Sequence, residues 1–178
     1  MIEDRKIESP NRLSILHSRS SILGSRMRLA PHTLRLLRSA RIAHLATADK
    51  SDQPHVIPIC FAFDGKHFFS PIDEKPKRTA PNKLKRLKNI QENPNVALVI
   101  DHYDEDWRKL AYVLVFGKAR ILLSGARHRG AVRLLRKKYP QYRAMAIDDR
   151  PMISITPKTT RAWGGLQGTS RQRLVGKK

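Results

Sequence analysis

Cysteine is nearly absent from this sequence of 178 residues, since only Cys60 occurs. A single thiol excludes a disulfide scaffold, and its position in an apolar run suits a reducing compartment, so we expect a cytoplasmic protein. No run of about 18 apolar residues is present, which excludes a membrane-spanning helix. Residues Met1–Pro10 contain three acidic side chains and no apolar core follows them, so we expect no secretion signal.

Aromatic and acidic residues are also scarce. Aromatic side chains make up 6% of the chain, which leaves no obvious platform for stacking nucleic-acid bases. Asp and Glu number 15 against 36 Lys and Arg, so the formal net charge is +21 and the isoelectric point is near 11.0. Such a charge is typical of proteins that bind polyanions, and equally of a solvated basic surface, so both interpretations stay open.

The remaining composition is sufficient for one folded domain. Hydrophobic residues make up 40% of the chain and the mean hydropathy is -0.51. We expect the domain at residues 29–164, where apolar residues recur with strand-like and helix-like spacing. Residues 1–28 are rich in Ser and Arg and predict a basic, flexible arm. Residues 165–178 contain basic residues and no acid, and predict a basic tail.

Local patterns predict three helices and six strands in this domain. Pro58 inside a strand indicates an edge or a bulge, Asp64-Gly65 indicates a hairpin turn, and Gly117 indicates a bulge or a barrel corner. Consecutive strands joined by hairpins favour an antiparallel sheet, which at this size curls into a small barrel with flanking helices. The predicted helices are 31–40, 82–91 and 125–139, and the predicted strands are 42–47, 54–63, 67–70, 95–103, 110–123 and 152–156.

The segment Ser70–Ile90 is the most informative for binding. Lys75, Lys77 and Arg78 lie on a loop bracketed by prolines, just before a helix for which Asn82 is the predicted N-cap. A helix N-terminus offers free backbone N–H groups and the positive end of the helix dipole, so these cations predict a phosphate site with Ser70 as a further donor. Three later cations are interpreted as solvated charges on the helix, namely Lys85, Arg86 and Lys88.

Three runs of the sequence together resemble the pyridoxamine 5'-phosphate oxidase-like (PPOX) family of FMN-binding split barrels, and within it the branch of F420 (deazaflavin)-dependent enzymes. The runs are ARIAHLATADKSDQPHVIPICFAFDGKHFFSPIDEKPKR, LKNIQENPNVALVIDHYDEDW and VLVFGKARIL. The resemblance covers about Arg41 to Trp163. It implies a mainly β fold, a six-stranded antiparallel split β-barrel with flanking helices. It also implies a homodimer that binds F420 or FMN at the subunit interface.

The resemblance also assigns individual residues. Tyr112 matches a position that reaches the cofactor from the neighbouring subunit, and Trp163 matches an aromatic residue at the edge of the pocket. The strand that lines the flavin-type ring matches Val56, Ile57, Pro58 and Ile59, and the phosphate ligands match Ser70, Lys75, Lys77, Arg78 and, more weakly, Lys83. True pyridoxamine phosphate oxidases carry Arg and Lys where this chain has Ile57 and Ala62, which argues against vitamin B6 as the substrate.

The leading hypothesis is therefore an oxidoreductase that transfers hydride between F420 or FMN and a small organic substrate. No catalytic acid or base is assigned, although His44, His55 and His102 are candidates for a proton donor, and no metal site is predicted. The alternative is a split-barrel protein that carries flavin or haem without turnover. A third hypothesis is nucleic-acid binding through the basic arm, the tail and the helix Arg127–Lys138. Sequence-specific recognition is not expected, because no known DNA- or RNA-reading motif is present.

Overall fold

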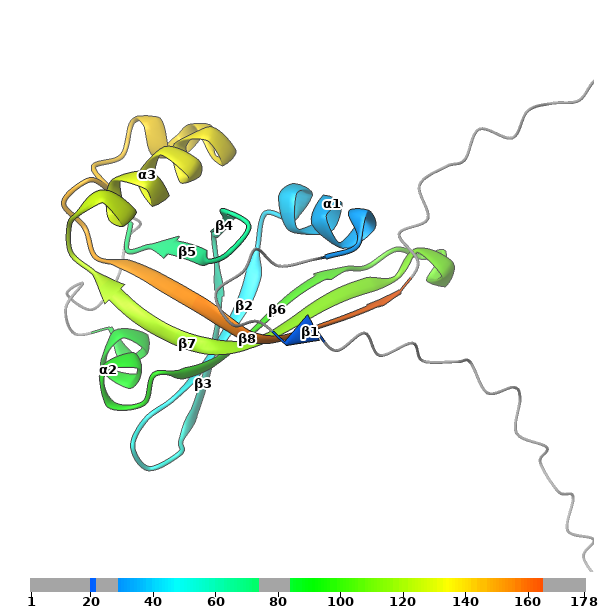
Figure 1. Ribbon diagram of the computed structural model, residues 1–178, viewed down its shortest axis with the longest axis horizontal. Coiled ribbons are helices and arrows are strands. Elements are labelled where there is room, and N and C mark those ends of the chain that lie inside the picture. Colours follow the sequence, from blue (N-terminus) through cyan, green and yellow to red (C-terminus); the bar gives the residue numbers. More distant parts are fainter. Residues whose placement is uncertain (1–19, 22–28, 74–83, 165–178) are drawn as a thin grey trace, which may run out of the picture.

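The computed structural model describes residues 20–21, 29–73 and 84–164, and every structural statement below refers to these residues (Figure 1). The predicted ligands Lys75, Lys77, Arg78 and Lys83 lie outside them, as do most of the basic arm and the whole tail. No helix in the described ranges has both the length and the apolar character needed to cross a membrane.

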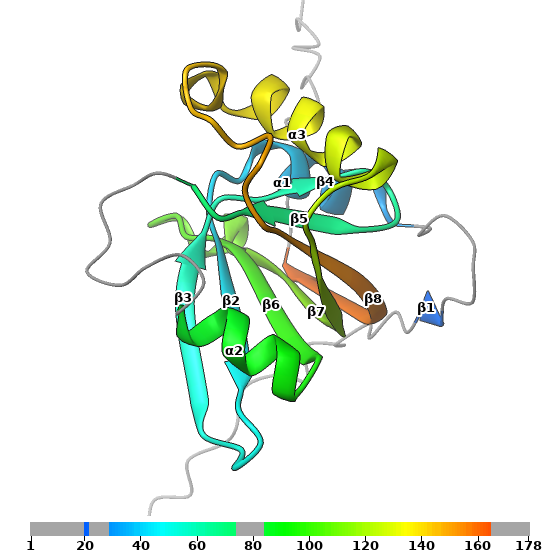
Figure 2. The ribbon, with the colours of Figure 1, turned by 90° about the vertical axis from the view of Figure 1, so that its left-hand side faces the viewer.

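The described chain is dominated by one antiparallel sheet that curls around a core (Figure 2). Its strands follow the order β3-β2-β6-β7-β8-β5-β4, and β1 pairs with β8 beside this path. This confirms the predicted mainly β, antiparallel, curled fold with flanking helices. The strands are β1 (Ser20–Ser21), β2 (Ala43–Ala48), β3 (Pro54–Ile59), β4 (Ala62–Phe63), β5 (Phe68–Pro71), β6 (Asn95–His102), β7 (Ala111–Leu122) and β8 (Met152–Gly164).

The sheet has eight strands where the resemblance implied six, for two local reasons. The predicted strand 54–63 divides at Cys60 and Phe61 into β3 and β4, which occupy opposite ends of the strand order. The two-residue strand β1 accounts for the other addition. Two residues therefore connect the two ends of the curled sheet.

The strand β8 is longer than predicted. The sequence pattern placed its end at Thr156, just before Pro157, a residue type that cannot donate to a strand ladder. Instead Pro157 lies opposite Gly117, where the register of β7 against β8 shifts after Phe116, and pairing then continues to Gly164. The bulge predicted at Gly117 is thus confirmed. A Cβ atom at Gly117 would lie 2.5 Å from the backbone oxygen of Thr156, so the two strands approach too closely for a side chain there.

Three α-helices flank the sheet. They are α1 (Pro31–Ser39), α2 (Lys85–Glu92) and α3 (Ala126–Lys138), with short 3-10 helices η2 (Trp107–Lys109) and η3 (Pro140–Arg143). Pro31 begins α1 and Pro140 follows α3, as the sequence predicted. The N-cap of α2 is Leu84, and the predicted cap Asn82 lies outside the described residues.

The core forms two clusters, which lie on opposite faces of the sheet because their residues alternate along β5 and β8. One contains Leu45, Leu98 and Val115 from the sheet, covered by apolar residues of α1 and α2. The other lies under α3 and contains Val132, Leu135 and residues of η3 and β8. The helices α1 and α2 pack on the first side of the sheet, and α3 covers the other side only at β4, β5 and the start of β8. That other side is left without a covering helix along β3, β2, β6 and β7 among the described elements.

Candidate functional site

The uncovered side of the sheet is the candidate site, and we call it the outer face. Strand register places its residues in cross-strand rows, because residues paired in a sheet share a face. One row joins β3 to β7 through Val56, Ala46, Ala97 and Phe116. The outer face comprises Val56 and Pro58 of β3, His44 and Ala46 of β2, Ala97, Val99 and Asp101 of β6, Tyr112, Leu114 and Phe116 of β7, and Arg161 and Trp163 of β8.

The outer face is largely apolar and yet accessible. Val56 is 61% exposed, Phe116 42% and Trp163 45%. A contiguous apolar surface of this kind marks a binding or association site in soluble proteins. What the outer face can do chemically is bind a flat apolar ring or a second apolar surface.

The predicted ring-lining strand divides between two environments. Side chains alternate along β3, so Val56 and Pro58 lie on the outer face, whereas Ile57 packs against the core and Ile59 belongs to it. A ligand at this strand can therefore touch the first two through side chains and the other two only through backbone. The predicted edge position of Pro58 is confirmed, since β3 has only β2 as a neighbour among the described strands.

Tyr112 and Trp163 come together at the far end of the sheet. They are directly opposite in the register of β7 against β8, and their rings stack with centroids 5.7 Å apart and planes 22° apart. Both rings remain partly exposed. The stack brings the two predicted aromatic residues together in one surface, and their contact with a ligand stays a prediction.

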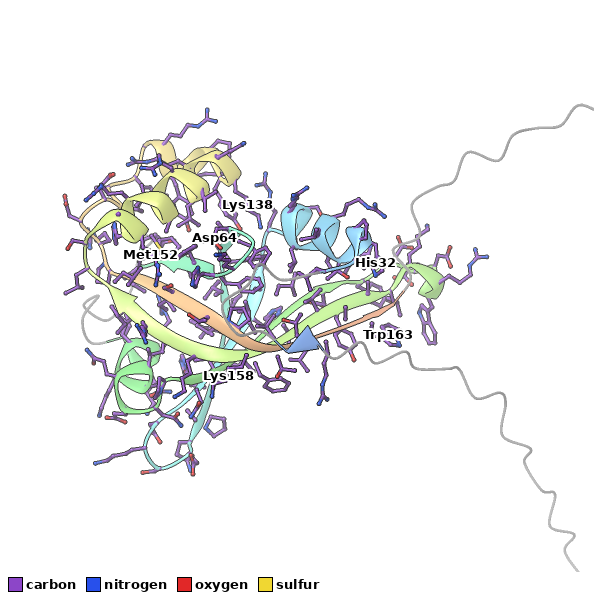
Figure 3. The ribbon with its side chains drawn as sticks, in the orientation of Figure 1. His32, Asp64, Lys138, Met152, Lys158 and Trp163 are labelled. Atoms are coloured by element: carbon purple, nitrogen blue, oxygen red, sulfur yellow. The ribbon has the colours of Figure 1, made fainter. Side chains whose placement is uncertain are left out.

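Ser70 lies far from this aromatic pair. It is buried in β5 and pairs with Ile153 near the start of β8, whereas Trp163 lies close to the end of the same strand. At about 3.3 Å per residue, the ten intervening steps span roughly 33 Å. Figure 3 shows the same separation, with Met152 and Trp163 at opposite ends of β8. One copy of the chain cannot bring Ser70 and Trp163 to the same small ligand.

Two of the cations on α2 have partners within the chain. Lys85 Nζ lies 2.6 Å from an oxygen of Asp49, and Lys88 Nζ lies 3.8 Å from Glu92. Their interpretation as surface charges stands. Arg86 differs, because burial lowers the pKa of its guanidinium while the charge of Asp73 opposes that shift. Sequence reasoning set Arg86 aside, although its place beside the predicted phosphate loop makes it a candidate anion ligand.

His55 marks a polar gap near Arg86. Burial lowers the pKa of His55, and the charges of Arg86 and Lys85 lower it further. Its Nδ1 atom is buried and has no hydrogen-bond partner in the described part of the chain, and the same is true of Oδ1 of Asn89 on α2. An unsatisfied buried polar atom requires a partner from outside the described residues. His55 Nδ1 suits a polar or anionic ligand group at the edge formed by β3 and α2, whereas Oδ1 of Asn89, an amide oxygen, needs a hydrogen-bond donor.

The outer face also contains an ionisable pair, of which sequence reasoning named only His44, as a candidate proton donor. His44 Nδ1 lies 3.7 Å from Asp101 Oδ1, and both side chains are about half exposed. His44 is the cross-strand neighbour of Pro58, and Asp101 is that of Tyr112. The pair therefore lies between the two predicted parts of the site. The signal available in the sequence was the alternation of β2, which places His44 on the face of the sheet away from its buried neighbours Ala43 and Leu45.

Comparison with solved structures supports the same fold. The conserved hypothetical protein Rv2991 from Mycobacterium tuberculosis is 18% identical over 82% of this chain and 90% of its own, with a TM-score of 0.62. HutZ, a heme storage protein from Vibrio cholerae, is 14% identical over 80% and 100%, with a TM-score of 0.60. An F420 reductase is 24% identical over 74% and 98%, with a TM-score of 0.53. At these identities the likeness establishes the fold alone.

Sequence comparison gives the family directly. No curated protein matches the chain. The family model described as Pyridoxamine 5'-phosphate oxidase matches residues 29–164, which is most of the chain and all of the sheet from β2 to β8. Together with the curled antiparallel sheet, this match shows that the chain belongs to the pyridoxamine 5'-phosphate oxidase family.

Proposed function

We propose that the chain is an oxidoreductase that works as a homodimer and transfers hydride between F420 or FMN and a small organic substrate. The observations that carry this proposal are the exposed, largely apolar outer face and the roughly 33 Å along β8 that separate the predicted phosphate ligand Ser70 from the predicted aromatic contact Trp163. A second copy related by two-fold symmetry supplies the missing half to each site.

Each subunit would hold the cofactor with one edge of its sheet. Val56 and Pro58 offer an apolar surface to the ring, while on the opposite side of β3 His55 Nδ1 and the half-buried Arg86 offer polar contacts to a cofactor group that passes around this edge strand. Tyr112 and Trp163 of the partner subunit would cover the ring from the other side. The phosphate ligands on this proposal are Ser70, Lys75, Lys77, Arg78 and Lys83.

The residues of the chain position and shield the reactants. When bound, the cofactor supplies the two-electron chemistry. The apolar rows of the outer face exclude water from the interface and so strengthen polar contacts inside it. His44, next to Pro58 and paired with Asp101, is placed to hold a proton for the substrate.

Charge favours an anionic cofactor. The net charge of +21 attracts a phosphate, and attracts the polyglutamate tail of F420 more strongly. Affinity for the tailed cofactor should therefore fall as salt is raised, whereas salt-independent binding would contradict this electrostatic argument.

Titration of the full chain with FMN, F420 and haemin at matched salt tests the proposal. We expect micromolar or tighter binding of F420 or FMN, weakened at least tenfold in a Lys77→Ala, Arg78→Ala variant. Removal of an exposed cation elsewhere, as in Lys158→Ala, is the control and should change affinity less than twofold. A Soret band with haemin alone would favour the haem-carrier alternative, a role that the name of HutZ illustrates. Binding of none of the three would refute a cofactor role.

A further inference from the structure

The outward side of α3 carries a stripe of cations. Arg129, Arg133 and Lys137 are exposed and recur at every fourth residue, so they lie above one another along the helix. Arg127 is also exposed, nearer the other flank of the helix, where it lines a groove with Lys137. Figure 3 shows nitrogen-tipped side chains projecting from α3 away from the sheet. With a rise of 1.5 Å per residue, the stripe is about 12 Å long.

Nothing in the described chain neutralises this stripe. No ion pair to Arg127, Arg129, Arg133 or Lys137 occurs among residues 29–73 and 84–164. Arg136, on the flank, is bound by Asp148 through two hydrogen bonds of 3.0 and 2.5 Å. The stripe is therefore available to an anion from outside the described chain.

The arrangement is unfavourable for the free helix. Like charges four residues apart repel each other, and cations in the first turn oppose the helix dipole. The first turn contains no acidic residue, and the N-cap Gly125 provides no side-chain hydrogen bond. A polyanion bound along the stripe would relieve both kinds of repulsion.

Gly130 lies within the same surface, and packing does not require it. A Cβ atom there would meet only the guanidinium of Arg133, at 4.0 Å. Glycine in a helix interior is less favourable than alanine, so its presence here is unexplained by the fold. The missing side chain does allow a large partner to approach the helix backbone closely.

Grooves lie on both flanks of the helix, each about the size of a small-molecule site. One, of about 360 Å³, is lined by Ser124, Arg129 and Arg133 and also by Asp148 and Asp149. The other, of about 390 Å³, is lined by Arg127, Arg133 and Lys137 and also by Asp64. Arg133 borders both grooves. The basic helix is thus a ridge between two depressions, a shape that fits into a wider groove of a partner.

We propose that the outward side of α3 binds a nucleic-acid duplex through its backbone phosphates, without reading the base sequence. One strand of a duplex presents a phosphate every 3.4 Å along its axis, so a 12 Å stripe spans about three to four of them. Arginine, which supplies three of the four exposed cations, matches phosphate geometry with paired N–H donors. An anionic membrane fits less well, because the exposed part of α3 lacks the large apolar side chains that insert into lipid.

Fluorescence anisotropy with a labelled 20-base-pair DNA duplex and the full chain tests this proposal. The variant Arg129→Gln, Arg133→Gln, Lys137→Gln removes the stripe, and Arg38→Gln, Lys118→Gln, Lys158→Gln removes the same number of exposed charges elsewhere. We expect the first to bind at least tenfold more weakly at 100 mM salt, and its slope of log affinity against log salt to fall by roughly 2–3. The control should lose less than threefold.

The variant Gly130→Leu tests whether the duplex approaches the backbone of α3 closely, without changing the charge of the helix. It should weaken duplex binding several-fold while leaving the salt slope unchanged, and circular dichroism should show that α3 stays folded. Equal losses in the stripe variant and its control would overturn the proposal, because binding would then follow net charge alone. It would also be overturned if the stripe variant lost binding to phosphatidylserine vesicles but kept its affinity for the duplex. F420 and FMN titrations should be unchanged, which makes this proposal independent of the cofactor site.

Discussion

Phe116 provides the sharpest test of the outer face as a subunit interface. Its side chain is 42% exposed in the single chain. For a ring of about 200 Å², that leaves about 80 Å² for a partner to bury, worth about 2 kcal/mol. Because a two-fold interface contains each residue twice, Phe116→Ala should destabilise the dimer by about 4 kcal/mol, or about a thousandfold in Kd.

Sedimentation velocity over a dilution series measures this effect. Leu123→Ala is the matched control, because Leu123 is 68% exposed but follows β7 outside the rows of the outer face. It should leave the dimer Kd within about threefold. A wild-type chain that is monomeric at every concentration, or a Phe116→Ala variant that dimerises as well as wild type, would refute the reasoning.

Further predictions concern stability. Gly117→Ala should destabilise the fold by about 1–3 kcal/mol, because its Cβ would collide with the Thr156 backbone. Gly130→Ala should stabilise the fold by up to about 1 kcal/mol, because alanine favours a helix interior over glycine. Thermal melting should show opposite shifts in melting temperature for the two variants, and equal shifts would contradict both predictions. Burial, with a smaller effect of Arg41, lowers the pKa of Lys138 from 10.5 to about 8. The unfolded chain then binds more protons between these values, so stability should rise with pH from about 8 towards 10. Burial raises the pKa of Tyr139 from 10.0 to about 12, so the buried phenol stabilises the fold less and less as the pH rises above 10. The urea titrations that measure the effect of Lys138 should therefore stay below pH 10. Lys138→Met should abolish the rise, and a rise that persists in this variant would assign it to another group.

Sequence patterns predicted most of the fold because alternation and turn chemistry are local properties. The strand predicted at 42–47 differs from β2 by one residue at each end, and the strand predicted at 95–103 differs from β6 by one residue at its end. A predicted strand stopped more than one residue too early only where a proline occurs in a paired strand. Pro157 is tolerated because Gly117 faces it across a bulge, and that pairing joins residues 40 positions apart.

The candidate site was less accessible to sequence reasoning because it depends on register. The alternation in β3 could have shown that Val56 and Ile57 face opposite sides, but not which side stays uncovered. The pairing of His44 with Asp101 and the stack of Tyr112 on Trp163 each join distant parts of the chain. Periodicity within one strand contains no information about its neighbours, so only the folded sheet brings these residues together.

The position of β8 has a consequence for how the chain folds as it is synthesised. β8 pairs with β7, β5 and β1, and it follows them all in the sequence. The pairs β2–β3, β2–β6 and β6–β7 and the β4–β5 hairpin can form as soon as β7 has left the ribosome, whereas the hairpin can join the rest of the sheet only through Met152–Ile155. Until then the nascent chain exposes two unpaired strand edges, those of β7 and β5, which are templates for pairing with other chains. Binding of a chaperone to the nascent chain should therefore be strongest after β7 emerges, and should end once β8 joins the two edges.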